Sequence, residues 1–420
     1  TNIPTPMQEV LKVIKPSTKE QAKVKKVVSA FIKKLDSKLK DAKAILGGSG
    51  AKDTWLSGNH DIDIFVQYDF KKYKEQSAEL SDLLKDSLKK AFPKIKLNNV
   101  HGSRDYFQLV YEKYNFEVVP IIKITKSEKA LNITDISPLH AVWVNKHTKK
   151  LKDDIRLAKQ FCRANKLYGA ESYISGFSGY VLEILIANFG SFNKFLKAII
   201  SMRLDQVVDP ENYYKGKDVF FELNRSKLQS PLIVIDPVDK SRNAAAALSK
   251  EKFMLLKKVA RDYLDKPNQD FFEKKEISFV KLNKKTKRNL VFITLEPLSG
   301  KEDVIGMRLL KAFNFLKREL VKFEVKKFGW DWDHKKKAVF YFTLKQMRLP
   351  DVEDRPGPPL KMEAAVKAFK KKNKDTFEKS GRIFSKDKVE FPELEKFVKN
   401  LLKAKYLKEK VKSVKDVKVV

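Results

Sequence analysis

Residues 47–65 read Gly-Gly-Ser-Gly-Ala-Lys-Asp-Thr-Trp-Leu-Ser-Gly-Asn-His-Asp-Ile-Asp-Ile-Phe, and the rest of the interpretation depends on them. The first four predict a small, flexible turn, and the last five begin an alternating run that predicts a strand over residues 61–68. Because side chains two apart on a strand share a face, Asp61 and Asp63 point one way and the isoleucines point into a core. Paired carboxylates favour a cation between them, and a glycine-rich turn offers N–H groups to an anion. The stretch therefore predicts a site for a metal and a phosphate.

The chain of 420 residues is strongly basic, with 88 Lys and Arg against 53 Asp and Glu and a formal net charge of +35. Its length suits roughly two to four domains, and 42% hydrophobic residues are enough to build cores. The charge excess predicts a polyanionic partner, either nucleic acid or an anionic membrane. The alternative is a lysine-rich genome or a hot habitat, which also enriches Lys and Glu.

Cysteine and histidine usage narrows the function classes. Cys162 is the only cysteine, which excludes an intrachain disulfide and a cysteine-based zinc site and suits a small core residue. The five histidines lack the spacing of a metal-binding helix: His60, His101, His140, His147 and His334. The sequence shows no apolar signal segment and no run near the roughly 18 apolar residues of a membrane span. We therefore expect a soluble, cytoplasmic protein without a membrane partner.

Glu117 is the third carboxylate of interest, and it lies in a predicted hairpin. The hairpin strands are residues 106–111 and 114–122, joined by Glu-Lys. An isolated strand carboxylate favours an exposed edge, but beside Asp61 and Asp63 a paired or metal-bound position is favoured. The other elements expected in this half are helices within residues 8–42, interrupted at 16–18, a strand at 42–46 and a helix within 74–92.

The second half of the chain predicts a helical region followed by a small α+β module. Residues 151–200 read as helices, with Ser178 as a natural N-cap. The further expected segments are a strand within 230–239, an alanine-rich helix from 240, a charged connector at 274–287, strand-helix-strand-strand at 290–295, 305–320, 321–328 and 337–344, a loop at 352–359 and lysine-rich helix from 362.

Carboxylates and a phosphate-binding turn together suit nucleotide chemistry. Phosphoryl transfer depends on positioning and charge stabilisation. Two metal ions about 3.5–4 Å apart activate the attacking oxygen and stabilise the leaving oxygen. Asp61, Asp63 and Glu117 are candidates to hold them. The glycine turn with Ser49 is a candidate to hold a triphosphate, and Lys52 adds positive charge.

The order Gly48-Ser49 followed by Asp61-Ile62-Asp63 resembles the signature of the nucleotidyltransferase superfamily typified by DNA polymerase beta. More segments, in the right order, resemble the archaeal (class I) CCA-adding enzymes, which are tRNA nucleotidyltransferases. They are residues 51–58, 117–120, 137–140, 156–159, 165–171, 176–180 and 236–243. The resemblance is dense over residues 40–245 and thinner beyond them.

The resemblance implies a role for particular residues. Asp61, Asp63 and Glu117 match the metal-binding carboxylates, with Mg²⁺ as the expected ion. Ser49 and Lys52 match contacts to the phosphates of the incoming nucleotide.

Four further matches line the family's nucleotide pocket. His140 and Lys159 match residues near phosphate, Tyr168 matches a residue near the sugar, and Arg242 matches the arginine that helps to read the base edge. Taken singly, each is a common loop, packing or surface residue. Only the joint pattern gives them functional weight.

Two of these positions depart from the family's usual pattern. Glu117 stands where Asp is usual, and its extra methylene brings the carboxylate to a different point. Lys52 stands where Arg is common, which replaces a planar fork of donors with a point charge.

The sequence thus predicts an α+β, multidomain protein. Its expected parts are a mixed-sheet nucleotidyltransferase head (1–135), a helical neck for nucleotide recognition (136–270), a small α+β body (271–350) and a basic helical tail that binds tRNA (351–420). The reaction implied is templateless addition of C, C and A to the 3′ end of tRNA from CTP and ATP, with release of diphosphate. A poly(A) polymerase-like terminal nucleotidyltransferase and a catalytically decayed RNA-binding relative remain alternatives. A homodimer stays open, because many members of the family dimerise.

Overall fold

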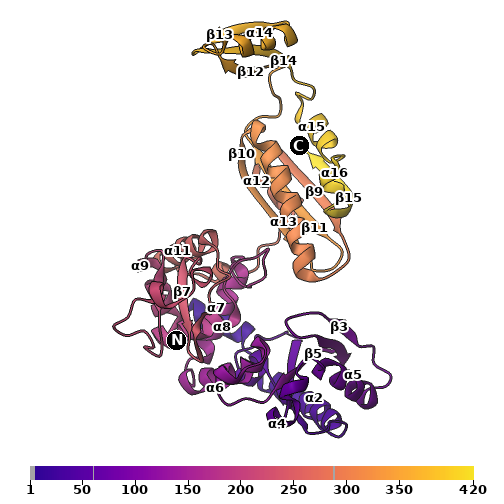
Figure 1. Ribbon diagram of the computed structural model, residues 1–420, viewed down its shortest axis with the longest axis vertical. Helices are drawn as coiled ribbons and strands as arrows, with labels where there is room; N and C mark the ends of the chain where they lie inside the picture. The colour runs from indigo at the N-terminus through magenta and orange to yellow at the C-terminus, as the bar shows by residue number, and fades with distance from the viewer. Residues whose placement is uncertain (1–4, 60, 287–288) are drawn as a thin grey trace. The chain divides into compact units, whose positions relative to one another are not determined.

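The computed structural model describes residues 5–59, 61–286 and 289–420. The chain divides into two compact units, Thr1–Lys274 (unit 1) and Lys275–Val420 (unit 2). Both contain sheets and helices, which confirms the predicted α+β class (Figure 1). The four-part division of the chain stays a prediction, and His60 lies outside the described residues.

The largest sheet of unit 1 is mixed, as predicted, and it contains the acidic run. Its order is β1-β2-β5-β4-β3, with β2 and β5 parallel and the other pairs antiparallel. The strands are β1 (Ala42–Leu46), β2 (Asp61–Tyr68), β3 (Asn98–Val100), β4 (Tyr106–Tyr111) and β5 (Tyr114–Ile122). The predictions of β1, β2 and the β4–β5 hairpin are therefore confirmed.

Two helices cover one face of this sheet: α2 (Thr18–Asp36) and α5 (Leu80–Ala91). Ile62 and Ile64 of β2 are buried in the core that these helices complete. Since neighbouring residues of a strand point to opposite faces, Asp61 and Asp63 face away from that core. The expected orientation of the acidic run is confirmed.

The glycine stretch is a short helix, α3 (Gly48–Lys52), so the prediction of a flexible turn is wrong. The N–H of Ala51 donates to the carbonyl of Gly47 at 2.9 Å, which closes the helical turn. The glycines are there because other groups approach closely. A Cβ on Gly47 would lie 2.4 Å from the ring of Phe65, and one on Gly48 would lie 1.6 Å from Oδ2 of Asp63.

A second core of unit 1 is mainly helical, as expected for residues 151–200. It includes the N-terminal helix α1, although α1 precedes the first sheet in the chain. Ser178 caps α8 by accepting a hydrogen bond from the N–H of Val181, as predicted. The helices are α1 (Pro6–Ile14), α6 (Ser137–His147), α7 (Lys152–Ala164), α8 (Gly179–Phe189), α9 (Phe192–Ser201) and α11 (Lys250–Asp265), with short α4 (Phe70–Tyr73) and α10 (Val219–Glu222) elsewhere in unit 1.

A small three-stranded sheet accompanies these helices: β6 (Gln206–Val208), β7 (Leu232–Asp236) and β8 (Asp239–Asn243). The strand predicted within 230–239 is confirmed, but the alanine-rich helix predicted from residue 240 is wrong. The buried Asn243 accepts hydrogen bonds from the N–H groups of Val234 and Ala245 and donates to the carbonyl of Lys227. Such local side-chain bonds hold the backbone out of a helix.

The larger sheet of unit 2 has the order β10-β11-β9-β15. The predicted strand-helix-strand-strand order is confirmed, although β10 begins at Val325 rather than at residue 321. The predicted connector 274–287 contains a helix, α12, whose Phe279 packs on Phe292, with ring centroids 5.7 Å apart; residue 287 itself is not described. The elements are α12 (Phe279–Thr286), β9 (Leu290–Pro297), α13 (Glu302–Glu319), β10 (Val325–Trp332), β11 (Ala338–Leu344), α15 (Leu394–Leu401), α16 (Lys405–Lys408) and β15 (Val411–Val419).

The helical tail predicted from residue 362 is wrong over much of its length. Residues 352–359, predicted as a loop, form β12 (Val352–Pro359) at the edge of a sheet, where proline is tolerated. It pairs with β14 (Arg382–Lys388), which pairs on its other side with β13 (Thr376–Lys379), and α14 (Glu363–Lys372) precedes both strands. Phe377 and Phe384, read as part of a helix, are cross-strand partners with ring centroids 5.6 Å apart.

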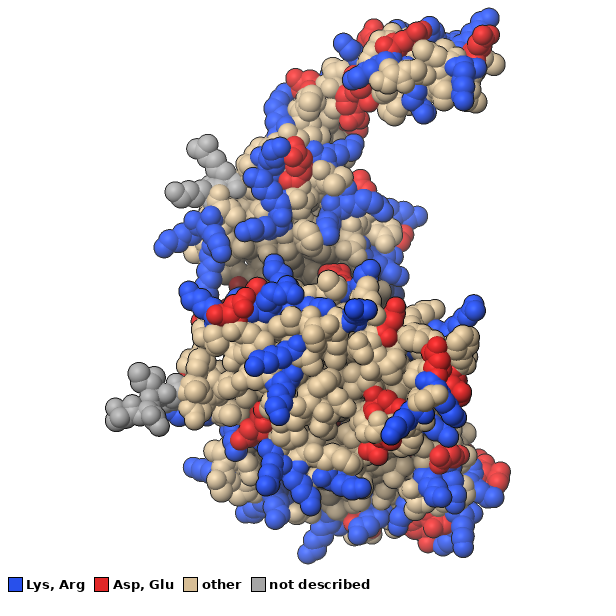
Figure 2. Space-filling model, turned by 90° about the vertical axis from the view of Figure 1, so that its left-hand side faces the viewer, with Lys and Arg blue, Asp and Glu red and all other residues tan. Residues whose placement is uncertain are grey.

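Lys and Arg side chains lie on the surfaces of both units, interspersed with acidic side chains (Figure 2). In the described part of the chain, no helix is long and apolar enough to cross a membrane.

Candidate active site

The register of β2 against β5 brings the predicted carboxylates to adjacent strands. Asp63 pairs with Glu117, and Asp61 pairs with Asn115, in a parallel arrangement. Asp61 is exposed, while Asp63 and Glu117 are half-buried. Residues that are 54 positions apart in the sequence therefore share one face of the sheet.

Asp63 lies in surroundings that disfavour its negative charge. Burial raises the pKa of Asp63 to about 6. The charges of Glu117 and Asp61 act in the same direction, and the charge of Lys52 opposes them. A carboxylate in this position is stabilised as an anion when a cation binds beside it.

Amide side chains hold the other two carboxylates. Nε2 of Gln108 donates to Oε1 of Glu117 at 2.6 Å, and Nδ2 of Asn115 donates to Oδ1 of Asp61 at 3.0 Å. In the described parts of the chain, no three His, Cys, Asp or Glu side chains come together as a group that could hold a metal ion. The three predicted ligands are thus on neighbouring strands but are not gathered around one point.

The residues nevertheless fit a divalent cation. Their donor atoms are carboxylate oxygens, which Mg²⁺ and Ca²⁺ prefer. The raised pKa of Asp63 indicates a charge that the protein itself does not neutralise. Gly48 leaves room for the Asp63 carboxylate directly against the start of α3.

A cavity of about 250 Å³ brings four of the predicted nucleotide-binding residues beside Asp63. They are Ser49, Lys52, Lys159 and Tyr168. A neighbouring cavity of about 610 Å³ is lined by Asp61 and Glu117 together with Lys94, Lys96, Gln108 and Asn115. The carboxylates of β2 and β5 therefore border two cavities, Asp63 the smaller one and Asp61 and Glu117 the larger one.

Glu183 of α8 holds the two lysines of the smaller cavity. Its Oε2 accepts from Nζ of Lys52 at 2.6 Å, and its Oε1 accepts from Nζ of Lys159 at 2.8 Å and from Oγ1 of Thr54 at 2.6 Å. Burial alone raises the pKa of Glu183, but Lys159 and Lys52 outweigh it and lower the pKa to about 2. The sequence interpretation missed Glu183. Its signal was a single charge inside the apolar run Val-Leu-Glu-Ile-Leu-Ile.

The remaining predicted residues, His140 and Arg242, meet at a second buried carboxylate, Asp236. Nη1 of Arg242 donates to Oδ2 of Asp236 at 2.9 Å, and Nε2 of His140 lies 3.2 Å from the same oxygen without the geometry of a hydrogen bond. Tyr180 donates to Oδ1 at 2.9 Å and stacks on the ring of His140. Burial lowers the pKa of His140, and Asp236 opposes this only in part.

Tyr180 connects the two groups of residues. Nζ of Lys52 lies 5.6 Å from the centre of the Tyr180 ring, on the side of the smaller cavity. Arg163, another residue that the sequence interpretation did not select, lines the same cavity, and its guanidinium lies 4.7 Å from the centre of the Tyr168 ring. Four of the six predicted nucleotide-binding residues thus line one cavity, and the other two, His140 of α6 and Arg242 of β8, lie with Asp236 on the far side of Tyr180.

Three protein-family models match the chain. A nucleotidyltransferase domain matches residues 28–162, and the second domain of tRNA nucleotidyltransferases matches residues 153–273. The C-terminal domain of CCA-adding enzymes matches residues 298–418. The matches follow one another along the chain in the order that the resemblance implied.

Similar proteins and structures agree with these models. A solved structure of Cid1, described by its RNA terminal uridylyl transferase activity, covers 64% of this chain and 98% of its own, with a TM-score of 0.52 at 14% identity, which indicates the fold alone. The CCA-adding enzyme of Pyrococcus abyssi is 31% identical over 368 residues, which are 84% of this chain and 80% of that protein. That of Nanoarchaeum equitans is 35% identical over 380 residues, which are 88% of this chain and 90% of that protein. The chain therefore belongs to the archaeal family of CCA-adding enzymes, which are tRNA nucleotidyltransferases.

Proposed function

We propose that this protein adds C, C and A to the 3′ end of tRNA without a nucleic-acid template, using CTP and ATP and releasing diphosphate. Family membership supports the reaction. The observation that carries the site is the register that sets Asp63 opposite Glu117, beside the cavity lined by Ser49 and Lys52.

In this proposal Asp61, Asp63 and Glu117 hold divalent metal, and the expected ion is Mg²⁺. Nucleotidyltransferases of this superfamily use divalent metal ions, and one solved structure of Cid1 carries Mg with 3′-dATP. A metal held there would lower the pKa of the tRNA 3′-hydroxyl and would neutralise negative charge at the α-phosphate. The half-buried Asp63 orients the reacting groups from β2, on the face of the sheet that points away from the core.

The phosphates occupy the smaller cavity. The hydroxyl of Ser49 and the ammonium of Lys52 bind them, and Lys159 adds positive charge from the cavity wall. Tyr168, which lines the same cavity, contacts the sugar. His140 is half-buried, and its lowered pKa favours the neutral ring, so it serves as a hydrogen-bonding group beside the phosphates rather than as a second cation.

Arg242 reads the base. Base selection without a template needs a protein pocket whose hydrogen bonds fit C and A but not G or U. Asp236 fixes one side of the Arg242 guanidinium through Nη1 and leaves the other N–H groups for the base. The exposed fraction of the Arg242 side chain is 33%, so those groups are accessible.

tRNA is the proposed polyanionic partner. The head and neck, residues 1–270, carry the chemistry, and the basic body and tail, residues 271–420, bind tRNA. A tRNA substrate also suits the expected cytoplasmic location, and a homodimer remains part of the proposal.

The affinity for tRNA should fall steeply with salt, because Lys and Arg contacts to phosphate release counterions. If the affinity did not change with salt, the net positive charge would not contribute to tRNA binding.

The deciding experiment incubates the protein with Mg²⁺, CTP, ATP and a tRNA that lacks its terminal CCA. Addition of C, C and A followed by termination supports the proposal. Continued addition of A identifies a poly(A) polymerase-like enzyme. Binding of tRNA without any addition identifies the catalytically decayed relative, and Glu117→Asp, tested alongside, shows whether the longer carboxylate is the cause.

A further inference from the structure

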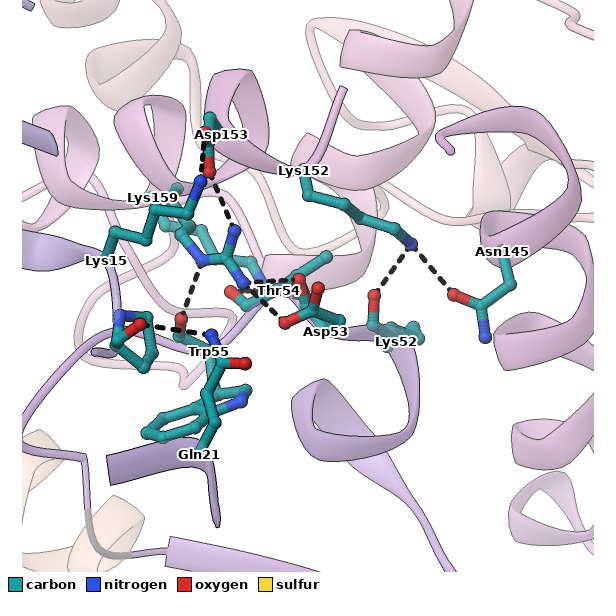
Figure 3. Close-up of polar contacts among 12 residues, drawn as sticks. Lys15, Gln21, Lys52, Asp53, Thr54, Trp55, Asn145, Lys152, Asp153 and Lys159 are labelled. Carbon is teal, nitrogen blue, oxygen red and sulfur yellow. Dashed lines mark hydrogen bonds and ion pairs between the residues drawn. The ribbon is translucent and has the colours of Figure 1, made fainter. Parts of the chain in front are cut away.

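The carbonyls at the end of α3 and in the segment that follows it are held by side chains of two neighbouring helices. Five successive carbonyls, from Ala51 to Trp55, accept hydrogen bonds from α6 and α7. In order along the segment, the bonds are Asn145 Nδ2 to the Ala51 oxygen at 2.9 Å, Lys152 Nζ to Lys52 at 2.7 Å, Arg156 Nη2 to Asp53 at 2.8 Å, Lys159 Nζ to Thr54 at 3.2 Å and Arg156 Nε to Trp55 at 3.1 Å. Figure 3 shows Lys152 between the Lys52 carbonyl and the side chain of Asn145.

The three cationic donors lie on one face of α7. Lys152, Arg156 and Lys159 are four and three residues apart, a spacing that aligns side chains along a helix. Irregular backbone needs partners for its carbonyls when it is shielded from water, and cations beside the C-terminal end of a helix stabilise its last carbonyls. The segment that follows α3 therefore depends on α7 for its conformation.

Arg156 makes the largest share of these contacts. Its guanidinium bonds the carbonyls of Asp53 and Trp55 and forms ion pairs with the carboxylates of Asp53 at 2.6 Å and Asp153 at 2.8 Å. Only 1% of Arg156 is exposed, and the residue does not line the nucleotide cavity. Its planar fork of donors, which a lysine lacks, spans two carbonyls at once.

We propose that Arg156 is a positioning residue for nucleotide binding, which rests on the function proposed above. It holds the carbonyls of Asp53 and Trp55, and through this segment it positions α3, whose Ser49 and Lys52 line the cavity. Lys52 is the junction, because its carbonyl is held from α7 while its ammonium bonds Glu183 of α8.

The test compares Arg156→Lys with wild type in the full chain. Lysine keeps the positive charge but reaches only one of the two carbonyls. The matched control is Arg261→Lys on the exposed surface of α11. Hydrogen exchange without substrates measures how often the backbone amides of residues 47–56 open. Steady-state kinetics with CTP, ATP and the shortened tRNA measure KM and kcat for each nucleotide.

We expect Arg156→Lys to speed exchange in residues 47–56 by about tenfold, while Arg261→Lys leaves it unchanged. The KM for CTP and for ATP should each rise by about tenfold with kcat within about threefold of wild type, the pattern of lost ground-state binding. Should Arg156→Lys fail to fold, Lys152→Gln takes its place and should raise both KM values by about threefold, since it removes the one bond that Lys152 makes to the segment.

Wild-type exchange and wild-type KM values in the variant would overturn the proposal. So would a lower kcat with unchanged KM, because a merely structural role reduces the amount of active enzyme without changing nucleotide affinity. A wild-type chain that adds no nucleotide would instead overturn the proposed function, and the exchange measurement would still decide whether Arg156 fixes residues 51–55.

Discussion

Asp63 and Glu183 line the same cavity, yet their surroundings shift their pKa values in opposite directions. Burial raises the pKa of Asp63 to about 6. Burial also acts to raise the pKa of Glu183, but Lys159 and Lys52 lower it to about 2. The ammonium of Lys52, which favours the Asp63 anion, already forms an ion pair with Glu183.

The two carboxylates differ in whether the protein itself compensates their negative charge. Glu183 has its charge neutralised inside the protein, so it has little to gain from a ligand. Asp63 does not, so a cation that binds beside it is stabilised by a charge that the fold leaves uncompensated. A buried acid alone is therefore a weak functional signal, while a buried acid beside other acids is a strong one.

The largest expected effect is on Asp63. Asp63→Ala should lower nucleotide addition by at least about 10⁴-fold, because metal-dependent stabilisation of the reacting oxygens is lost. tRNA binding, measured by filter retention, should stay within about twofold of wild type, since one acidic side chain adds nothing to phosphate contacts.

Asp86→Ala on the exposed face of α5 is the control for Asp63→Ala and should keep full activity. Substantial nucleotide addition by Asp63→Ala would show that Asp63 is not needed for the reaction. Asp63 and Glu183 would then not differ in function.

Glu183→Gln should destabilise unit 1 by about 3 kcal/mol, because two largely buried ammonium groups lose their counter-charge. The measurement is the urea dependence of hydrogen exchange in residues 179–189. Glu9→Gln, which breaks an exposed ion pair with Lys12, is the control and should cost less than about 0.5 kcal/mol. Equal stability of Glu183→Gln and wild type would mean that the buried pair is not needed by the fold.

Local patterns predicted the sheet well and the glycine stretch poorly. The alternation over residues 61–68 and the hairpin that carries Glu117 are period-two signals, and strands follow them directly. The glycines at 47 and 48 gave no such signal. Their reason is the approach of Phe65 and Asp63, which comes from packing across the sheet and not from neighbours in the sequence.

Partners of charged residues were also beyond the reach of local patterns. Glu183 and Asp236 hold the residues selected by resemblance, but each contact joins distant segments of the chain. In unit 2, phenylalanines about seven residues apart suit a helix face or a pair of strands equally well, and only the pairing of Phe377 with Phe384 distinguishes them.

Asp63→Asn should change how stability depends on pH in protein freed of divalent ions. The folded-state pKa of Asp63, about 6, exceeds the ordinary value of 3.8, so the folded protein holds the proton more tightly. The resulting stability is fully present below pH 3.8 and is lost as the pH rises through about 6. Between pH 4 and 7, wild type should therefore lose about 2 kcal/mol relative to Asp63→Asn.

The control for the pH series of Asp63→Asn is the same series for Glu183→Gln, because the pKa of Glu183 is shifted in the opposite direction. The stability from Glu183 is present above pH 4.5 and is lost as the pH falls toward about 2, so wild type should lose stability relative to Glu183→Gln in that window. A constant difference between wild type and Asp63→Asn from pH 4 to 7 would show that Asp63 is not perturbed.

Glu117→Gln should change the free energy of unfolding least among these variants. The variant tests whether burial or the Glu117 charge raises the pKa of Asp63. Burial is the largest cause and the Glu117 charge is the second, so removing that charge should lower the pKa of Asp63 below about 6 but leave it above 3.8. Asp63→Asn changes the free energy of unfolding by an amount that depends on pH. Glu117→Gln should alter that amount by less than about 1 kcal/mol. Carbon-13 NMR titration of the Asp63 carboxyl measures it directly. A return of that pKa to 3.8 would make the neighbouring carboxylate, and not burial at the foot of α3, the feature that sets Asp63 apart from Glu183.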